Sequence, residues 1–184
     1  MSTKLVFDTS ALISLSLAET LHLVDKLGLE ALVPPTVFSE LKETSAYNDD
    51  IAISARRALS FVKECMLGLD EQSRELADRL SKMPKLDRGE AEALALAQQV
   101  EAERLVIDDI DAMGALLGVA KIMGIEIVPS SWLIVKSYLE GVLEYDQAVG
   151  VLDALAVARG WRQSVIYGTA ILMMEKAQEA KGEK

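Results

Sequence analysis

The stretch KLVFDTSALISL, residues 4–15, decides the fold of this 184-residue chain. Its first four residues predict a short strand that ends at Asp8, and apolar residues then recur at helical spacing. The stretch RLVIDDIDAMG, residues 104–114, has the same order: a strand over residues 104–107, an acid at its end, and then a helix. Strands that alternate with helices in this way predict a parallel sheet covered by helices on both faces.

Proline and glycine mark the other elements. Two further strands are predicted over residues 29–33 and 125–128, and proline follows each of them. Helices are predicted from Pro35, over residues 49–82 with a break near Gly68, over about 87–101, and up to Met123 with a C-terminal cap at Gly124. We therefore expect an α/β fold: a single doubly wound domain with a mostly parallel sheet of four to five strands.

The end of the chain reads as helical, with breaks at residues 141–145 and around Gly160. Residues 1–130 are accordingly assigned to the sheet domain. Residues 131–184 are assigned to a C-terminal helical extension that packs on the same domain.

Composition excludes several classes of protein. Hydrophobic residues make up 51% of the chain, which can form a sizeable core, and the net charge of -10 argues against binding to nucleic acid through bulk positive charge. One cysteine and one histidine exclude an intramolecular disulfide, a Cys-rich zinc site and an HExxH helix. No apolar run approaches the roughly 18 residues that cross a bilayer, so we expect a cytoplasmic protein without a membrane partner.

Acids follow two of the predicted strands. Asp8 follows the first strand, and Asp108 and Asp109 follow the strand over residues 104–107. Ligands of open parallel sheets bind beyond the carboxyl ends of the strands, so these acids converge on one rim if the two strands are neighbours. Asp8 and Asp109 could instead only cap the helices that follow them. Both acids in such positions together favour a site.

Two further acids have competing interpretations. In LDRGEAEALALA, residues 86–97, Glu90 begins an apolar helical face, where a charge is costly unless it is compensated. The same residue also completes a capping box with Asp87, and both interpretations can hold in part. Glu40 borders the apolar face of its helix, and periodicity alone favours a surface acid there.

Clustered carboxylates raise one another's pKa unless a cation lies between them. A cluster of oxygen ligands without His or Cys suits a hard cation, Mg²⁺ or Mn²⁺, that keeps several waters. Such a site can activate water and stabilise the leaving oxygen of a phosphodiester. Residue spacing thus indicates a metal-dependent phosphoryl-group enzyme and leaves its substrate open.

At these residues the sequence resembles the PIN domain, the fold of metal-dependent ribonucleases that includes the VapC-type toxins. Four segments carry the resemblance in order: LVFDTSALI (5–13), VPPTVFSELK (33–42), GEAEALALA (89–97) and LVIDDIDA (105–112). Residues 124–144 and 158–172 resemble a prokaryotic subgroup with extra C-terminal helices. The region that contains the four motifs spans residues 4 to about 128.

The resemblance implies roles for particular residues. Asp8, Glu40, Glu90 and Asp109 would be catalytic acids that hold Mg²⁺ or Mn²⁺ directly or through water, and Asp108 would support them as a further metal ligand. Ser10 matches the hydroxyl position of the first motif and is assigned to substrate binding. RNA would also need a local basic track on so acidic a chain, and the residues before Glu90 are the candidates: Arg79, Lys82, Lys85 and Arg88.

The leading hypothesis is therefore a Mg²⁺- or Mn²⁺-dependent ribonuclease, with a toxin of a toxin–antitoxin pair as a narrower version. The partners considered are an RNA substrate, an antitoxin protein and a second copy of the chain in a homodimer. A non-catalytic PIN-like binding module is the main alternative. An aspartate-dependent phosphatase is disfavoured, because such sites usually pair acids as Asp-x-Asp and here Asp8 is followed by Thr9 and Ser10.

Overall fold

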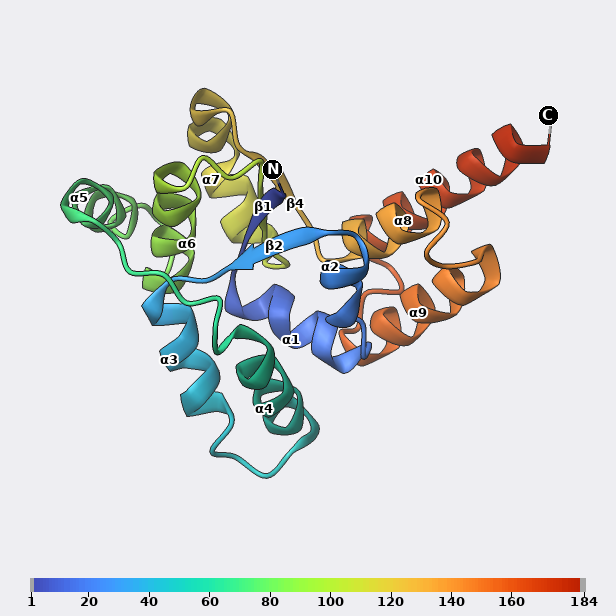
Figure 1. Ribbon diagram of the computed structural model, residues 1–184, viewed down its shortest axis with the longest axis horizontal. Helices are drawn as coiled ribbons and strands as arrows, with labels where there is room; N and C mark the ends of the chain where they lie inside the picture. Colours follow the sequence, from blue (N-terminus) through green and yellow to red (C-terminus); the bar gives the residue numbers. More distant parts are fainter. Residues whose placement is uncertain (1, 183–184) are drawn as a thin grey trace.

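The computed structural model describes residues 2–182, which form four strands and ten helices (Figure 1). The strands are β1 (Thr3–Phe7), β2 (Leu29–Leu32), β3 (Arg104–Val106) and β4 (Glu126–Val128). The helices are α1 (Thr9–Leu17), α2 (His22–Lys26), α3 (Pro35–Thr44), α4 (Asp50–Val62), α5 (Glu71–Leu80), α6 (Arg88–Gln99), α7 (Ile110–Met123), α8 (Ser131–Leu139), α9 (Tyr145–Ala158) and α10 (Val165–Gly182). The predicted α/β fold is confirmed.

The four strands form one parallel sheet in the order β2-β1-β3-β4. From β1 the chain first builds the sheet outward to β2 and then returns to the other side of β1 to add β3 and β4. The strand order therefore reverses between β1 and β3. That junction is where open parallel sheets bind ligands, beyond the carboxyl ends of the strands.

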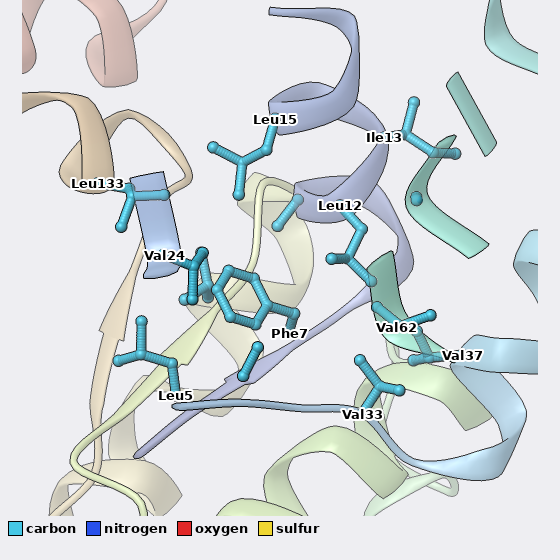
Figure 2. Packing of buried hydrophobic residues seen from close by; sticks show 14 of the residues in the cluster. Leu5, Phe7, Leu12, Ile13, Leu15, Val24, Val33, Val37, Val62 and Leu133 are labelled. Atoms are coloured by element: carbon cyan, nitrogen blue, oxygen red, sulfur yellow. The ribbon is translucent and has the colours of Figure 1, made fainter. Parts of the chain in front are cut away.

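Side chains of β1 alternate between two hydrophobic layers. Leu5 and Phe7 pack into one buried cluster with α1, α3 and α4, whereas Val6 points into a second cluster with α6 and α7. Figure 2 shows Phe7 among Leu12, Val24 and other labelled side chains of the first cluster. The period of two along a strand thus accounts for a sheet covered on both faces.

Helix starts are set by local hydrogen bonds. The N-cap side chains of α1, α4, α5, α6 and α7 accept a backbone N–H three residues on, and all of them are aspartates: Asp8, Asp49, Asp70, Asp87 and Asp109. Pro35 occupies the first turn of α3, and Gly124 ends α7 with a left-handed φ of 74°.

One helix end is not signalled by the apolar spacing. The helical pattern that follows Asp8 continues without a marked break, yet α1 ends at Leu17 and α2 begins at His22. The backbone N–H and the hydroxyl of Thr20 both donate to the Leu15 carbonyl, at 2.8 and 3.1 Å, and Glu19 between them has a φ of 56°. This tight closure ends the helix without glycine or proline.

The last three helices lie beside the sheet (Figure 1). Their side chains form a third hydrophobic cluster. Helices α8, α9 and α10 contact one another, and α9 also contacts α1. The C-terminal end of α9 is thereby held near the helix that follows β1. Within residues 2–182, no helix combines the length and the apolarity that a bilayer crossing requires.

Candidate active site

A cavity of about 390 Å³ lies at the carboxyl edge of the sheet. Asp8, Glu40, Glu90 and Asp109 all line it, and they come from the end of β1, from α3, from α6 and from the loop after β3. The structure thus brings the four acids that the resemblance named to one cavity. Their chemical roles stay predictions.

Asp8 is buried at the point where β1 passes into α1, with 3% of its surface exposed. Its Oδ1 accepts the Ala11 N–H at 2.8 Å, and its Oδ2 accepts the Ser10 hydroxyl at 2.6 Å. Burial raises the pKa of Asp8 to about 8, and the neighbouring charge of Asp108 acts in the same direction. Asp8 therefore caps α1 and also lines the acidic cavity.

Ser10 links the two central strands. While its hydroxyl donates to Asp8, its oxygen accepts the Asp108 N–H at 3.1 Å. The Asp8 N–H donates to the Val106 carbonyl at 3.1 Å. Two hydrogen bonds, this one and the one from the Asp108 N–H to Ser10, therefore join the ends of β1 and β3. This geometry makes Ser10 a residue that orients Asp8, and its contact with substrate stays a prediction.

Glu40 lies in the cavity and not on the outer surface that periodicity alone favoured. The Thr9 hydroxyl donates to its Oε2. Gly89 makes room for the carboxylate, because a Cβ at that position would lie 2.6 Å from Glu40 Oε1 and 2.9 Å from Oε2. Burial raises the pKa of Glu40.

Glu90 satisfies both interpretations that the sequence left open. The Asp87 N–H donates to Glu90 Oε2 at 3.0 Å and the Glu90 N–H donates to Asp87 Oδ1 at 2.8 Å, which is a complete capping box. Glu90 also lines the cavity with only 9% of its surface exposed. Burial raises its pKa to about 7, and the charges of Asp87 and Asp109 add to the effect.

The structure separates Asp108 from Asp109. Asp109 lines the acidic cavity and caps α7 through Oδ1, which leaves Oδ2 without a hydrogen bond to the described residues. Asp108 is buried, and its two oxygens accept the N–H and the hydroxyl of Ser130, each at 2.8 Å. It lines a second cavity of about 280 Å³ instead. Of these two neighbouring acids, Asp109 is thus the one that lines the same cavity as Asp8, Glu40 and Glu90.

The residues of the predicted basic track lie outside the acidic cavity. Lys85 pairs with Asp111 at 2.6 Å, and Arg88 pairs with Glu92 at 2.7 Å and also with Asp78. Lys82 is exposed, and Arg79 pairs with Glu75 at 3.4 Å. Several of these positive charges are therefore already opposed by carboxylates, and their contact with RNA stays a prediction.

Sequence reasoning did not assign several lining residues of the cavity to the site, among them Thr9, Gly89 and Arg159. Arg159 stands at the C-terminal end of α9 and lines both cavities. Its motif, ARGWRQS, carries no acid and lies far along the chain from the four acids. Only the packing of α9 against α1 brings it there. The signal for Gly89 was its place directly before Glu90 in a helix start.

The lining residues fit a hydrated divalent cation. In residues 2–182 no three His, Cys, Asp or Glu side chains converge closely enough to hold a metal ion by themselves. Mg²⁺ commonly keeps several waters and takes only one or two carboxylates directly, so a roomy cavity lined by oxygen ligands suits it. Glu40 and Glu90 each keep an Oε1 without a hydrogen bond to the described residues, in addition to Asp109 Oδ2.

Comparison with models of protein families identifies a family for this chain. The family model described as DUF3368: PIN domain matches residues 4–176. The matched region runs from β1 into α10 and includes all four acids and Arg159. No curated protein matches the chain.

Proposed function

The chain belongs to the PIN-domain family, and on this premise we propose that it is a ribonuclease that hydrolyses RNA phosphodiester bonds with Mg²⁺ or Mn²⁺. PIN domains are generally nucleases and usually use divalent metal ions. The observation that carries the proposal is that carboxylates from four separate elements line one cavity. Burial raises the pKa of three of them, Asp8, Glu40 and Glu90.

Such an arrangement is unfavourable for folding unless something compensates it. A buried carboxylate loses hydration, and acids that share a cavity repel one another. Capping a helix needs one acceptor and not a cluster of acids. The caps therefore explain Asp8 and Asp109 taken singly, but they do not explain why four acids line one cavity. A cation that binds among them offsets the repulsion.

The residues would divide the work as follows. Asp8, Glu40, Glu90 and Asp109 would hold the ion directly or through water, and Asp108 would support them through the strand end. A bound divalent ion would polarise phosphoryl oxygens and lower the pKa of water in the cavity. Ser10 and Thr9 would orient Asp8 and Glu40 through the hydrogen bonds described above.

The experiment is cleavage of a mixed-sequence RNA by the purified chain with Mg²⁺, with Mn²⁺ and with a chelator. We expect cleavage with either ion, none with the chelator, and none by Asp8→Asn. Asp146→Asn is the matched control, because Asp146 is exposed in the first turn of α9 and lines neither this cavity nor the second one. RNA binding without cleavage under any of these conditions would favour the non-catalytic binding module.

A toxin role is a narrower form of this proposal. A neighbouring gene for a small DNA-binding antitoxin would support it. Growth arrest on expression of the wild type, relieved by Asp8→Asn, would test it in cells.

A further inference from the structure

We propose that Arg159 binds a phosphate of the RNA backbone beside the acidic cavity, which it lines. This inference rests on the proposed ribonuclease function and adds to it the residue that brings an anionic substrate to an acidic rim. It also gives the C-terminal helices a part in substrate binding, because Arg159 ends α9.

Arg159 stands where two cavities meet. The acidic cavity of about 390 Å³ and the second cavity of about 280 Å³ share Ser10, Asp109 and Arg159 among their lining residues. A single-stranded RNA that passes over Asp109 would have a cavity on each side of that acid. Arg159 lines both cavities at this crossing.

The charge balance of the cavities calls for a cation. Carboxylates line both of them: Asp8, Glu40, Asp87, Glu90 and Asp109 in the first, and Asp108, Asp109 and Asp111 in the second. Among the described lining residues of these two cavities, Arg159 is the one cationic side chain. A phosphodiester that enters without a cation to meet it would be repelled.

The guanidinium of Arg159 has hydrogen-bond donors available for a ligand. In residues 2–182 it forms no ion pair, and its buried Nε has no hydrogen-bond partner. Lys85 and Arg88, by contrast, are paired with carboxylates. The planar guanidinium suits phosphate, because it can donate two parallel N–H bonds to two oxygens.

The backbone around Arg159 is held in place. The Trp161 N–H donates to the Ala156 carbonyl at 2.7 Å, the Gly160 N–H donates to Val157, and Gly160 has a left-handed φ of 68°. These bonds form a Schellman ending of α9. The guanidinium carbon lies 5.6 Å from the centre of the Trp161 ring, a cation–π contact that orients the side chain.

The competing role is purely structural. The charge of Arg159 lowers the pKa of Asp108 against the effect of burial, so the arginine also acts as a counterion to that acid. A counterion stabilises the fold and does not change how RNA binding depends on salt. Salt dependence therefore separates the two roles.

The test is binding of a labelled single-stranded RNA of mixed sequence, in chelator so that it stays intact, over about 50–200 mM KCl. Arg159→Ala should weaken binding by about 10- to 100-fold and reduce the slope of log K against log salt by about 0.7. Arg159→Lys should keep the slope and lose part of the affinity. Arg162→Ala is the matched control, because Arg162 is exposed on the same segment and lies outside both cavities, and it should change neither.

Thermal unfolding of every variant and steady-state cleavage with Mn²⁺ complete the test. Support would be a raised KM in Arg159→Ala with a melting temperature close to that of the wild type. An unchanged slope in Arg159→Ala, whatever its stability, would overturn the inference while leaving the nuclease intact. A wild type that neither binds nor cleaves RNA would overturn the proposed function and this inference together.

Discussion

The helices α6 and α9 begin with the same hydrogen bond in different surroundings. In α6 the Asp87 N–H donates to the carboxylate of Glu90 at 3.0 Å, and in α9 the Glu144 N–H donates to the side-chain amide oxygen of Gln147 at 3.0 Å. Gln147 is exposed, whereas Glu90 is buried against other acids and its pKa rises to about 7.

The difference teaches what capping alone requires. A neutral amide oxygen is a sufficient acceptor at the start of α9, and a carboxylate in the buried position of α6 is the less favourable choice for folding. The acid at position 90 is therefore better explained by the cavity that it faces than by the helix that it starts. Each of the following predictions tests that contrast.

The largest effect is expected from Glu90→Gln, which makes the start of α6 resemble that of α9. The amide keeps the acceptor, so the free energy of unfolding of the metal-free protein should stay level or rise. RNA cleavage should fall by about 100-fold or more, because the substitution removes a carboxylate that would hold the metal ion. Single-turnover cleavage and urea unfolding measure the two quantities.

The converse substitution, Gln147→Glu, is its control and should leave cleavage unchanged. Full activity in Glu90→Gln, together with a stability loss of about 1 kcal/mol, would reduce Glu90 to a capping residue.

Divalent ions should stabilise the folded protein by binding among the four acids. An ion that binds only the folded protein adds about 2.7 kcal/mol at a hundredfold excess over its Kd. Mn²⁺ or Mg²⁺ should therefore raise the melting temperature of the wild type and of Gln147→Glu. Asp8→Asn should lose most of this rise in differential scanning calorimetry, and an equal rise in that variant would place the ion elsewhere.

The pH dependence of metal-free stability should report the same acids. Folding raises the pKa of Asp8 from 3.8 to about 8, so the folded state binds this proton more tightly than the unfolded state. The resulting stability is complete below pH 4 and is lost as the pH rises towards 8, by on the order of 5 kcal/mol.

Chemical unfolding of the metal-free protein between pH 4 and 8 measures this loss. Asp8→Asn should make the curve less steep, since the amide does not titrate, and Gln147→Glu should leave it unchanged. The slope that remains in Asp8→Asn comes from the other buried acids, such as Glu90. A wild-type curve that rises over this interval would contradict the assigned burial of Asp8.

A smaller effect is expected from Gly89→Ala. The added Cβ would meet Glu40 Oε1 at 2.6 Å, and the flexible end of Glu40 would move away from the cavity. Cleavage should fall by about tenfold, within the range for residues that orient a metal site, with little change in unfolding. Gly150→Ala in α9 is the matched control, because a Cβ there meets nothing within 4 Å, and it should stabilise the helix by about 0.5–1 kcal/mol.

The smallest effect is expected from Asp87→Ala, which removes the cap of α6 and keeps Glu90. Unfolding free energy should drop by about 1 kcal/mol while cleavage is retained. Urea unfolding and the RNA cleavage assay check both parts. If cleavage disappeared with only this stability loss, Asp87 and not Glu90 would be the important acid of the third motif.

The sequence predicted the elements that local physics controls. The four strands, the helix that opens at Pro35 and the cap at Gly124 follow from short apolar runs and from residues with restricted backbone angles. Asp8 and Asp109 were also accessible, because an acid directly after a strand lies at the sheet edge whatever the rest of the chain does.

Glu40 shows where such reasoning stops. Its position on the border of an apolar helical face suits a surface acid equally well. The packing of α3 against α6, with Gly89 leaving space for the carboxylate, decides that it lies among the other acids.

What the sequence by itself determined is thus a parallel α/β sheet with acids at its carboxyl edge, because periodicity, capping and strand ends act over a few neighbouring residues. What only the tertiary structure decided is which residues meet at one cavity. Glu40 from α3 and Glu90 from α6, which the resemblance named but no local pattern placed, lie there together with Arg159 from the end of α9. These residues come together through contacts between helices far apart in the chain. Such contacts depend on the shape and volume of packed side chains, which no local pattern records.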